Sequence, residues 1–211
     1  NIDSLLSDNG DTGGVFAYNS ITWQMRDKAC DQLRKLVDVC DNVTGFMMTH
    51  SIGGGTGSGL CSYMLMRMSV DYKKKTNVCY SIYPSNILST SIVEPYNALL
   101  AMYSLSYSSN ITLAFDNEAI YNICQRNLHI AKPDVNNINR LIAKVISSVT
   151  APFRFDGELH TNLNELQASL IPFPSLQFIT TGMSPIVPKM DVTTTLNDVQ
   201  TITNECLNPT N

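Results

Sequence analysis

The chain has 211 residues and a formal net charge of −4, so it lacks the excess of basic residues that binding to nucleic acid requires. Hydrophobic residues make up 44% of the chain and charged residues 15%, which is typical of a folded protein and excludes a disordered one. No apolar stretch is long enough to span a membrane, and no signal peptide is visible. We therefore expect one large domain, or one domain and part of another.

The cysteines and histidines show no pattern of a metal site. Six cysteines are scattered singly through apolar segments without a C-x-x-C pair, and the three histidines are far apart in the sequence. This distribution predicts reduced thiols in the core of a cytosolic protein, and no metal ligands. The first residue is Asn1 rather than Met, and the first clear element starts late. Both features lead us to expect a fragment or a processed chain.

The first elements in chain order are a loop, a helix, a strand and a second helix. Residues 1–18 are polar and rich in glycine, which favours a loop. A helix is expected from Ser20, a suitable N-cap, to Asp41, because apolar residues recur there at steps of three and four. A short apolar strand at 45–50 and a helix at 60–68 should follow.

Between that strand and the second helix lies the sequence GGGTGSG, from Gly53 to Gly59, with five glycines in seven residues. A backbone so poor in side chains can take positive φ angles and approach a ligand closely. A helix start has unpaired N–H groups and the positive end of the helix dipole, so an anion such as phosphate is the expected occupant. The hydroxyls of Ser51, Thr56 and Ser58 add donors. The alternative is a glycine-rich surface turn without a ligand.

The order of strand, loop and helix then occurs twice more. Strands are expected at 78–83 and 111–115, each followed by a polar loop and a helix, the last of these helices starting at residue 119. Such alternation predicts a doubly wound parallel sheet, in which ligands gather at the carboxyl ends of the strands. The loops at that edge hold three candidate binding residues, Thr90, Glu94 and Asn117.

The remaining chain contains a long helix and several shorter elements. The long apolar helix is expected to begin at Asn139 and to end at Pro152. Glu165 falls in the first turn of a short helix, where the helix dipole alone favours an acidic residue. A strand at 175–181 and a polar loop at 183–196 follow.

These motifs resemble those of one known family. The glycine run lacks the Lys of a Walker loop and the last glycine of the dinucleotide fingerprint, and it resembles the signature that binds the GTP phosphates in the tubulin and FtsZ-like family. The segments VEPYN, from residue 93, and DNEAIYNIC, from residue 116, resemble the α-tubulin branch of that family almost letter for letter. The resemblance runs from about Ser4 to Asn211 and corresponds to roughly the middle half of a tubulin.

The resemblance implies a fold and a ligand. The fold is a Rossmann-like GTPase domain over residues 1–157, lacking its N-terminal part, followed by the beginning of a two-layer α/β sandwich domain over 158–211. The ligand is GTP with Mg²⁺. The main residues that contact the magnesium ion would lie outside this chain. In this family Glu94 would meet the ribose, and Asn117 and Asn139 the guanine edge. The implied nucleotide-binding set is Ser51, Gly54, Gly55, Thr56, Gly57, Thr90, Glu94, Asn117 and Asn139, with no metal ligand among them.

The resemblance also implies an activity and partners. The α-tubulin branch carries a Glu at the position of Glu165 that acts on the GTP of the neighbouring β-tubulin, so the implied enzyme is a GTPase working across a subunit contact. A carboxylate suits this role because it can orient the attacking water. The implied protein pairs with β-tubulin, polymerises into microtubules of the cytoplasmic cytoskeleton, and meets microtubule-associated proteins but neither nucleic acid nor membrane.

Several residues depart from the pattern of that branch. Thr12 stands in place of an Asn, Val135 in place of an aromatic residue over the guanine, and Asn162 in place of an acidic residue near Glu165. We expect weaker or more permissive base binding and slower hydrolysis. These departures keep open a tubulin-like structural protein with weakened or lost GTP turnover. A nucleating member closer to γ-tubulin is a further alternative. The segments DNEAIY and RFDG fit the α-tubulin branch better than γ-tubulin.

Overall fold

A computed structural model describes residues 23–85, 91–155, 157, 162–188 and 198–208 of the chain. Several expectations from the sequence concern positions outside the described residues. These are the loop at 1–18 with Thr12, the helix cap Ser20, the binding residue Thr90, and most of the loop at 183–196.

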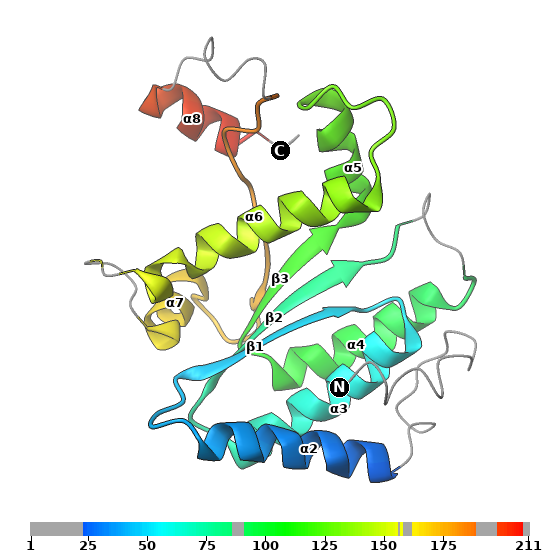
Figure 1. Ribbon diagram of the computed structural model, residues 1–211, viewed down its shortest axis with the longest axis vertical. Coiled ribbons are helices and arrows are strands. Elements are labelled where there is room, and N and C mark those ends of the chain that lie inside the picture. Colours follow the sequence, from blue (N-terminus) through cyan, green and yellow to red (C-terminus); the bar gives the residue numbers. More distant parts are fainter. Residues whose placement is uncertain (1–22, 86–90, 156, 158–161, 189–197, 209–211) are drawn as a thin grey trace.

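The described strands form one parallel sheet in the order β1-β2-β3-β4 (Figure 1). The first six residues of β2 are all buried, as expected for a strand inside a parallel sheet that is covered on both faces. The strands are β1 Gly45–Ser51, β2 Thr76–Tyr83, β3 Ile111–Asp116 and β4 Phe178–Thr180.

Helices cover both faces of this sheet (Figure 1). On one face α3 (Gly55–Asp71) connects β1 to β2, α4 (Glu94–Ser108) connects β2 to β3, and α2 (Trp23–Asp38) packs beside α3. On the other face lies α6 (Val135–Arg154). The predicted doubly wound α/β fold is therefore confirmed. The other described helices are α5 Asn117–Arg126, α7 Leu163–Leu170 and α8 Val199–Cys206, and no helix in the described ranges is both long and apolar enough to cross a membrane.

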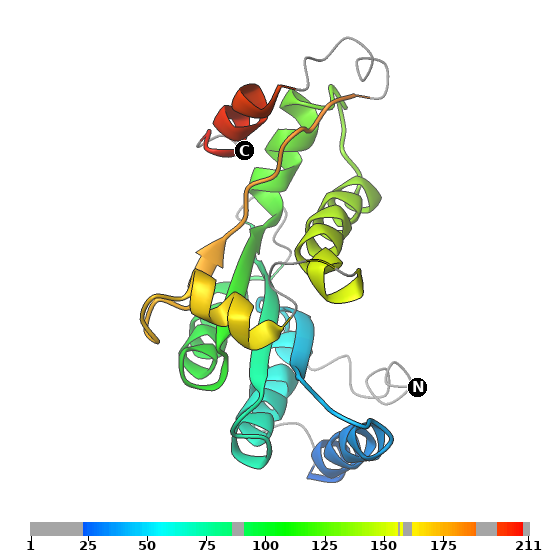
Figure 2. The same cartoon turned by 90° about the vertical axis from the view of Figure 1, so that its left-hand side faces the viewer.

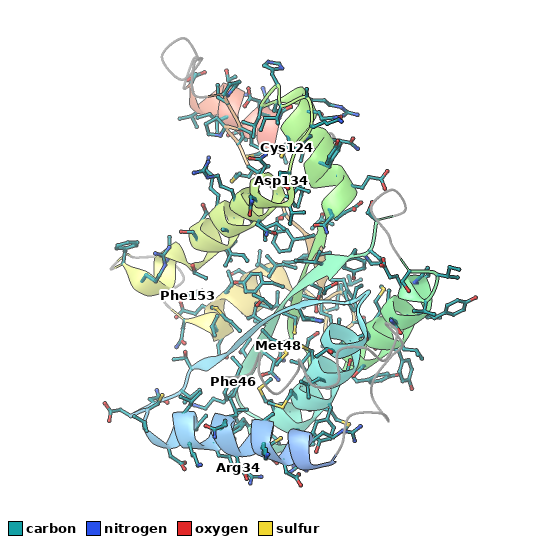
Figure 3. All side chains as sticks on the ribbon, turned by 45° about the vertical axis from the view of Figure 1, so that its right-hand side comes forward. Arg34, Phe46, Met48, Cys124, Asp134 and Phe153 are labelled. Atoms are coloured by element: carbon teal, nitrogen blue, oxygen red, sulfur yellow. The ribbon has the colours of Figure 1, made fainter. Side chains whose placement is uncertain are left out.

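The sheet separates two apolar clusters. Val78 and Tyr80 of β2 belong to the cluster that packs against α6, whereas Cys79 between them belongs to the cluster under α3 and α4. Successive residues of a strand point to opposite faces, so β2 contributes to both clusters. Phe46 and Met48 of β1, labelled in Figure 3, pack against the second cluster. Burial on both faces fixes the sheet between the two helical layers.

Several helix boundaries expected from the sequence are wrong, because packing and helix caps override local propensity. α3 begins at Gly55 rather than at residue 60, since the glycine run itself forms the first helical turn. α6 begins before Asn139 and runs through Pro152 to Arg154. A proline in the last turn of a helix removes one backbone hydrogen bond, which does not end the helix there.

Aspartate caps explain the early starts of α5 and α6. Asp116 accepts a hydrogen bond from the Glu118 N–H at 2.9 Å, so α5 begins at the next residue, Asn117. Asp134 accepts one from the Val135 N–H at 2.7 Å and starts α6. Both carboxylates also lie at the positive end of a helix dipole, where a negative charge is stabilising.

The short helix α7 docks at the amino end of β2, beside the sheet (Figure 2). Its first residue, Leu163, is 4% exposed and belongs to the cluster under α6. The Thr76 hydroxyl at the start of β2 donates to Asn164 Oδ1 at 2.5 Å. Glu165 therefore lies in the first turn of α7, as predicted.

The last described strand joins the same sheet. β4 pairs in parallel with β3, with Thr112 opposite Phe178. Residues 178–180, which the sequence analysis assigned to a second domain, thus extend the sheet of the first. The boundary at residue 157 stays a prediction.

Candidate functional site

A hollow of about 290 Å³ opens at the carboxyl edge of the sheet, where β1 and β2 end and α4 and α5 begin. Four of the predicted binding residues, Ser51, Gly54, Glu94 and Asn117, come together in its wall. This is the place where doubly wound folds bind ligands. The complete lining is Ser51, Gly53, Gly54, Tyr83, Pro84, Ser85, Glu94 and Asn117.

The amino end of α3 is suited to an anion. Gly54 is the N-cap residue and no side chain caps the helix. The Ser58 N–H donates to the Gly54 carbonyl oxygen at 3.0 Å, which is the first hydrogen bond of the helix. The N–H groups of Gly55, Thr56 and Gly57 precede that bond and lie at the positive end of the dipole. The first turn carries no acidic residue that would repel an anion.

Close packing leaves no room for a side chain at Gly57. A Cβ atom at Gly57 would lie 2.1 Å from the backbone oxygen of Ser51, so any side chain would push the first turn of α3 away from β1. A Cβ atom at Gly54 would meet nothing within 4 Å, and the φ angle there is −82°. The positive φ angles expected of this run are absent at Gly53, Gly54 and Gly57. Close packing of the helix and an open backbone explain these glycines instead.

The three hydroxyls of this segment have different surroundings. Ser51 is exposed and lines the hollow, and Thr56 is half-buried in the first turn of α3. Ser58 is fully buried and donates to the Gly54 carbonyl oxygen at 2.6 Å. The expectation that Ser58 faces a phosphate is therefore wrong, because the carbonyl one turn back is its acceptor.

Besides Gly53 of the glycine run, three wall residues lie outside the predicted binding set, Tyr83, Pro84 and Ser85. They lie at or directly after the end of β2, so the rule that pointed to the later residue Thr90 points to them as well. Ser85 is 6% exposed and its hydroxyl donates to Glu118 Oε2 at 3.3 Å. This bond joins the segment after β2 to α5.

The residues expected near the guanine base are not all at the hollow. Asn117 is in its wall, whereas Asn139 is exposed on the second turn of α6 and does not belong to the described lining. Val135, which replaces the expected aromatic residue, is 65% exposed at the start of α6. A role of Asn139 at the base stays a prediction.

His50, near the end of β1, is a further residue that the sequence analysis missed. Its side chain is 7% exposed, with Nδ1 2.9 Å from the Gly57 carbonyl oxygen and Nε2 2.9 Å from Ser81 Oγ. A carbonyl only accepts, so Nδ1 carries the proton and Nε2 accepts from the Ser81 hydroxyl. Burial lowers the pKa of His50, against the opposing effect of the bond to Gly57. The neutral imidazole thus joins β1, β2 and the first turn of α3.

Glu165 lies at the opposite edge of the sheet. It is exposed on α7, which is anchored to Thr76 at the amino end of β2, whereas Tyr83 at the carboxyl end of β2 lines the hollow. β2 has eight residues, so its two ends are about 25 Å apart. A single chain therefore does not bring Glu165 to its own hollow.

The described residues do not form a metal site. No group of three His, Cys, Asp or Glu side chains within the described ranges is placed to hold an ion. These residues alone therefore do not fit the Mg²⁺ that the family resemblance implies.

This architecture, a parallel sheet with helices on both faces and a hollow at the carboxyl edge, defines a doubly wound α/β domain. The family described as "Tubulin/FtsZ family, GTPase domain" matches residues 1–125, and the chain belongs to this family. Over 211 residues the chain is 43% identical to the tubulin alpha-3 chain of Saccharomyces cerevisiae, covering 99% of this chain and 47% of that protein. It is 45% identical over 188 residues to the tubulin alpha-1 chain of Schizosaccharomyces pombe, covering 89% and 41%. The chain thus spans about half the length of the curated relatives that it matches.

The close contact at Gly57 predicts a large difference between two glycine variants. Gly57→Ala should lower the free energy of unfolding by about 1–3 kcal/mol, because the methyl group overlaps the Ser51 carbonyl. The control Gly54→Ala should change it by less than about 0.5 kcal/mol, since its methyl group meets open space. Urea denaturation of the full-length gene product measures both. Equal losses in the two variants would contradict the packing described here.

The burial of His50 predicts a pH dependence of stability. The pKa of His50 is lowered in the folded state, so the unfolded chain binds the proton more readily and stability falls as the pH drops below about 6.5. His50→Asn keeps a donor for the Gly57 carbonyl but does not titrate. The loss of stability between pH 7 and pH 5, measured by urea denaturation, should be smaller in His50→Asn than in the wild type. Parallel pH profiles for the two proteins would contradict this prediction, because protonation of His50 would then not contribute to the pH dependence of stability.

Proposed function

We propose that this chain is the nucleotide-binding part of an α-tubulin-like subunit, which binds GTP in the hollow and polymerises with β-tubulin into microtubules. The observation that carries the proposal is the placement of two candidate sites at opposite edges of one parallel sheet. The hollow lies at the carboxyl end of β2, and Glu165 lies beyond its amino end. Membership of the tubulin/FtsZ family and similarity to α-tubulins support the ligand and the partner.

The wall of the hollow offers groups for each part of GTP. The N–H groups from Gly54 to Gly57, at the start of α3, would receive the phosphates, and the exposed Ser51 hydroxyl would add a donor. The Glu94 carboxylate would accept from the ribose hydroxyls, and the Asn117 amide would supply a donor and an acceptor to the guanine edge. The residues that would hold Mg²⁺ are expected outside this chain, and the ion would supply positive charge beside the phosphates.

Sites at opposite edges of the sheet fit a head-to-tail polymer. A contact between two different surfaces joins each subunit to the next and, when it does not close into a ring, builds a filament. Such a contact would bring the amino edge of one subunit, with Glu165, onto the carboxyl edge of its neighbour. The partner in this contact would be β-tubulin, and the outer surface of the microtubule would meet microtubule-associated proteins in the cytoplasm.

In this arrangement Glu165 would act on the neighbour's GTP. Its carboxylate is exposed in the first turn of α7 and is free of any described ion pair. It would orient a water molecule whose oxygen attacks the γ-phosphorus, while the bond from that phosphorus to the leaving GDP oxygen breaks. Asn162, the N-cap residue of α7, is exposed and adds no second carboxylate, so slower hydrolysis is expected.

A second candidate is a tubulin-like structural or nucleating protein with weakened or lost GTP turnover. Two replacements favour it, Val135 in place of an aromatic residue and Asn162 in place of an acidic one. Both side chains are exposed, where they can alter a ligand or a subunit contact without disturbing the core. The assay of Glu165 separates this candidate from the first.

The proposed role of Glu165 predicts a loss of hydrolysis without a loss of binding. In the full-length product assembled with β-tubulin, Glu165→Gln should lower the rate of GTP hydrolysis in the polymer by roughly 100-fold, because an amide orients water poorly. The nucleotide content of the variant subunit itself should stay unchanged, since its own hollow lies at the other edge of the sheet. Phosphate release and nucleotide analysis of the denatured protein measure the two quantities.

Asp38→Asn is the matched control for charge. Asp38 is exposed at the end of α2 and belongs neither to α7 nor to the lining of the hollow, so its replacement removes one carboxylate outside both candidate sites and should leave hydrolysis unchanged. Hydrolysis that continues at the wild-type rate in Glu165→Gln polymer would refute the role of Glu165. Wild-type polymer with bound GTP but no hydrolysis would favour the second candidate.

A further inference from the structure

A buried side chain holds the glycine turn from behind. Asn97, in the first turn of α4, is 2% exposed, and its Nδ2 donates to the Gly53 carbonyl oxygen at 2.9 Å. Gly53 is where the chain leaves the sheet, because the Ile52 N–H still donates to the Ile82 carbonyl oxygen at 3.1 Å. Asn97 thus supplies a hydrogen-bond donor to the Gly53 carbonyl, which lies just beyond the last contact with the neighbouring strand.

We propose that Asn97 is a positioning residue that turns the Gly54 N–H toward the anion in the hollow. The C=O of Gly53 and the N–H of Gly54 belong to one trans peptide and point in opposite directions. Since the carbonyl points to the buried Asn97, the N–H points to the exposed side of the turn, where Gly54 lines the hollow. This inference rests on the proposed binding of a nucleotide phosphate at this turn.

The peptide between Gly53 and Gly54 needs such a restraint. Neither residue has a Cβ, so rotation of the peptide by half a turn meets little steric resistance. In the rotated peptide the Gly53 oxygen would face the anion and repel it. The bond from Asn97 Nδ2 stabilises the orientation in which the N–H faces the anion.

The other end of the turn is held in the same way. The Gly57 carbonyl oxygen accepts from His50 Nδ1 at 2.9 Å, and the Gly54 carbonyl oxygen accepts from the Ser58 N–H at 3.0 Å. Carbonyls on both sides of the helix start are therefore occupied within the protein. Asn97 acts on the peptide between Gly53 and Gly54, whose carbonyl neither the helix nor His50 holds in the described contacts.

Asn77 provides a matched control. It is a buried asparagine, 3% exposed, and its Nδ2 also donates to a backbone carbonyl, that of Ser108 at 3.3 Å. Asn77 lies near the amino end of β2, at the opposite edge of the sheet from the hollow. Its replacement removes a comparable buried hydrogen bond without touching the glycine turn.

The experiment compares binding of GTP and of guanosine, which has no phosphate. Dissociation constants are measured by equilibrium dialysis on the nucleotide-free, full-length gene product for the wild type, Asn97→Ala, Asn97→Asp and Asn77→Ala. Asn97→Ala should weaken GTP binding by roughly tenfold and leave guanosine binding within about twofold. Asn97→Asp should weaken GTP binding further, because a carboxylate repels the Gly53 oxygen and favours the rotated peptide. The aspartate side chain has the size of asparagine, so Asn97→Asp tests the inference even if Asn97→Ala does not fold.

The outcomes separate this inference from the proposed function. A loss confined to GTP in the Asn97 variants, with Asn77→Ala unchanged in the ratio of the two constants, supports the positioning role. Equal losses for GTP and guanosine, the same change of ratio in Asn77→Ala, or no loss at all would overturn it while nucleotide binding stands. Wild-type protein that binds no GTP would instead overturn the proposed function itself.

Discussion

The parallel direction of the strands is the constraint on which the rest of the structure depends. All carboxyl ends lie at one edge of the sheet, so the loops after β1, β2 and β3 meet there and form the hollow. All amino ends lie at the other edge, where α7 docks on β2 and presents Glu165. A sheet of this kind gives the molecule two different ends, which is what a head-to-tail polymer requires.

At the carboxyl edge, close packing and buried hydrogen bonds prepare the turn before any ligand arrives. Gly57 lets the first turn of α3 lie against the Ser51 backbone, and His50 ties that turn to the strands. Asn97 fixes the peptide before the helix. The side chains of His50 and Asn97 that hold the turn are buried and neutral, and they leave the backbone N–H groups at the start of α3 for a ligand. A site ordered in advance loses less entropy when the ligand binds.

The sequence predicted the fold and much of the wall of the hollow. Hydrophobic patterns and turn residues placed Ser51, Glu94 and Asn117 at one edge, because the direction of parallel strands alone decides where the loops fall. Prediction from the sequence failed where contacts between residues distant in the chain determine the structure. The start of α3 was placed too late, since glycine is a poor helix former and only packing against β1 explains the glycine turn. His50 and Asn97 were missed because their partners are backbone carbonyls 7 and 44 residues away, and such contacts leave no pattern in the sequence.

Nucleotide binding at the carboxyl edge of the sheet is tested most directly by the nucleotide content of the purified full-length gene product. Denaturation releases what the carboxyl edge holds, and chromatography against standards identifies and counts it. We expect about one guanine nucleotide with two or three phosphates for each subunit of this kind, because backbone N–H groups at a helix start lie beside polar side chains. Protein that is folded yet releases no guanine nucleotide, and takes up none when GTP is added, would contradict it.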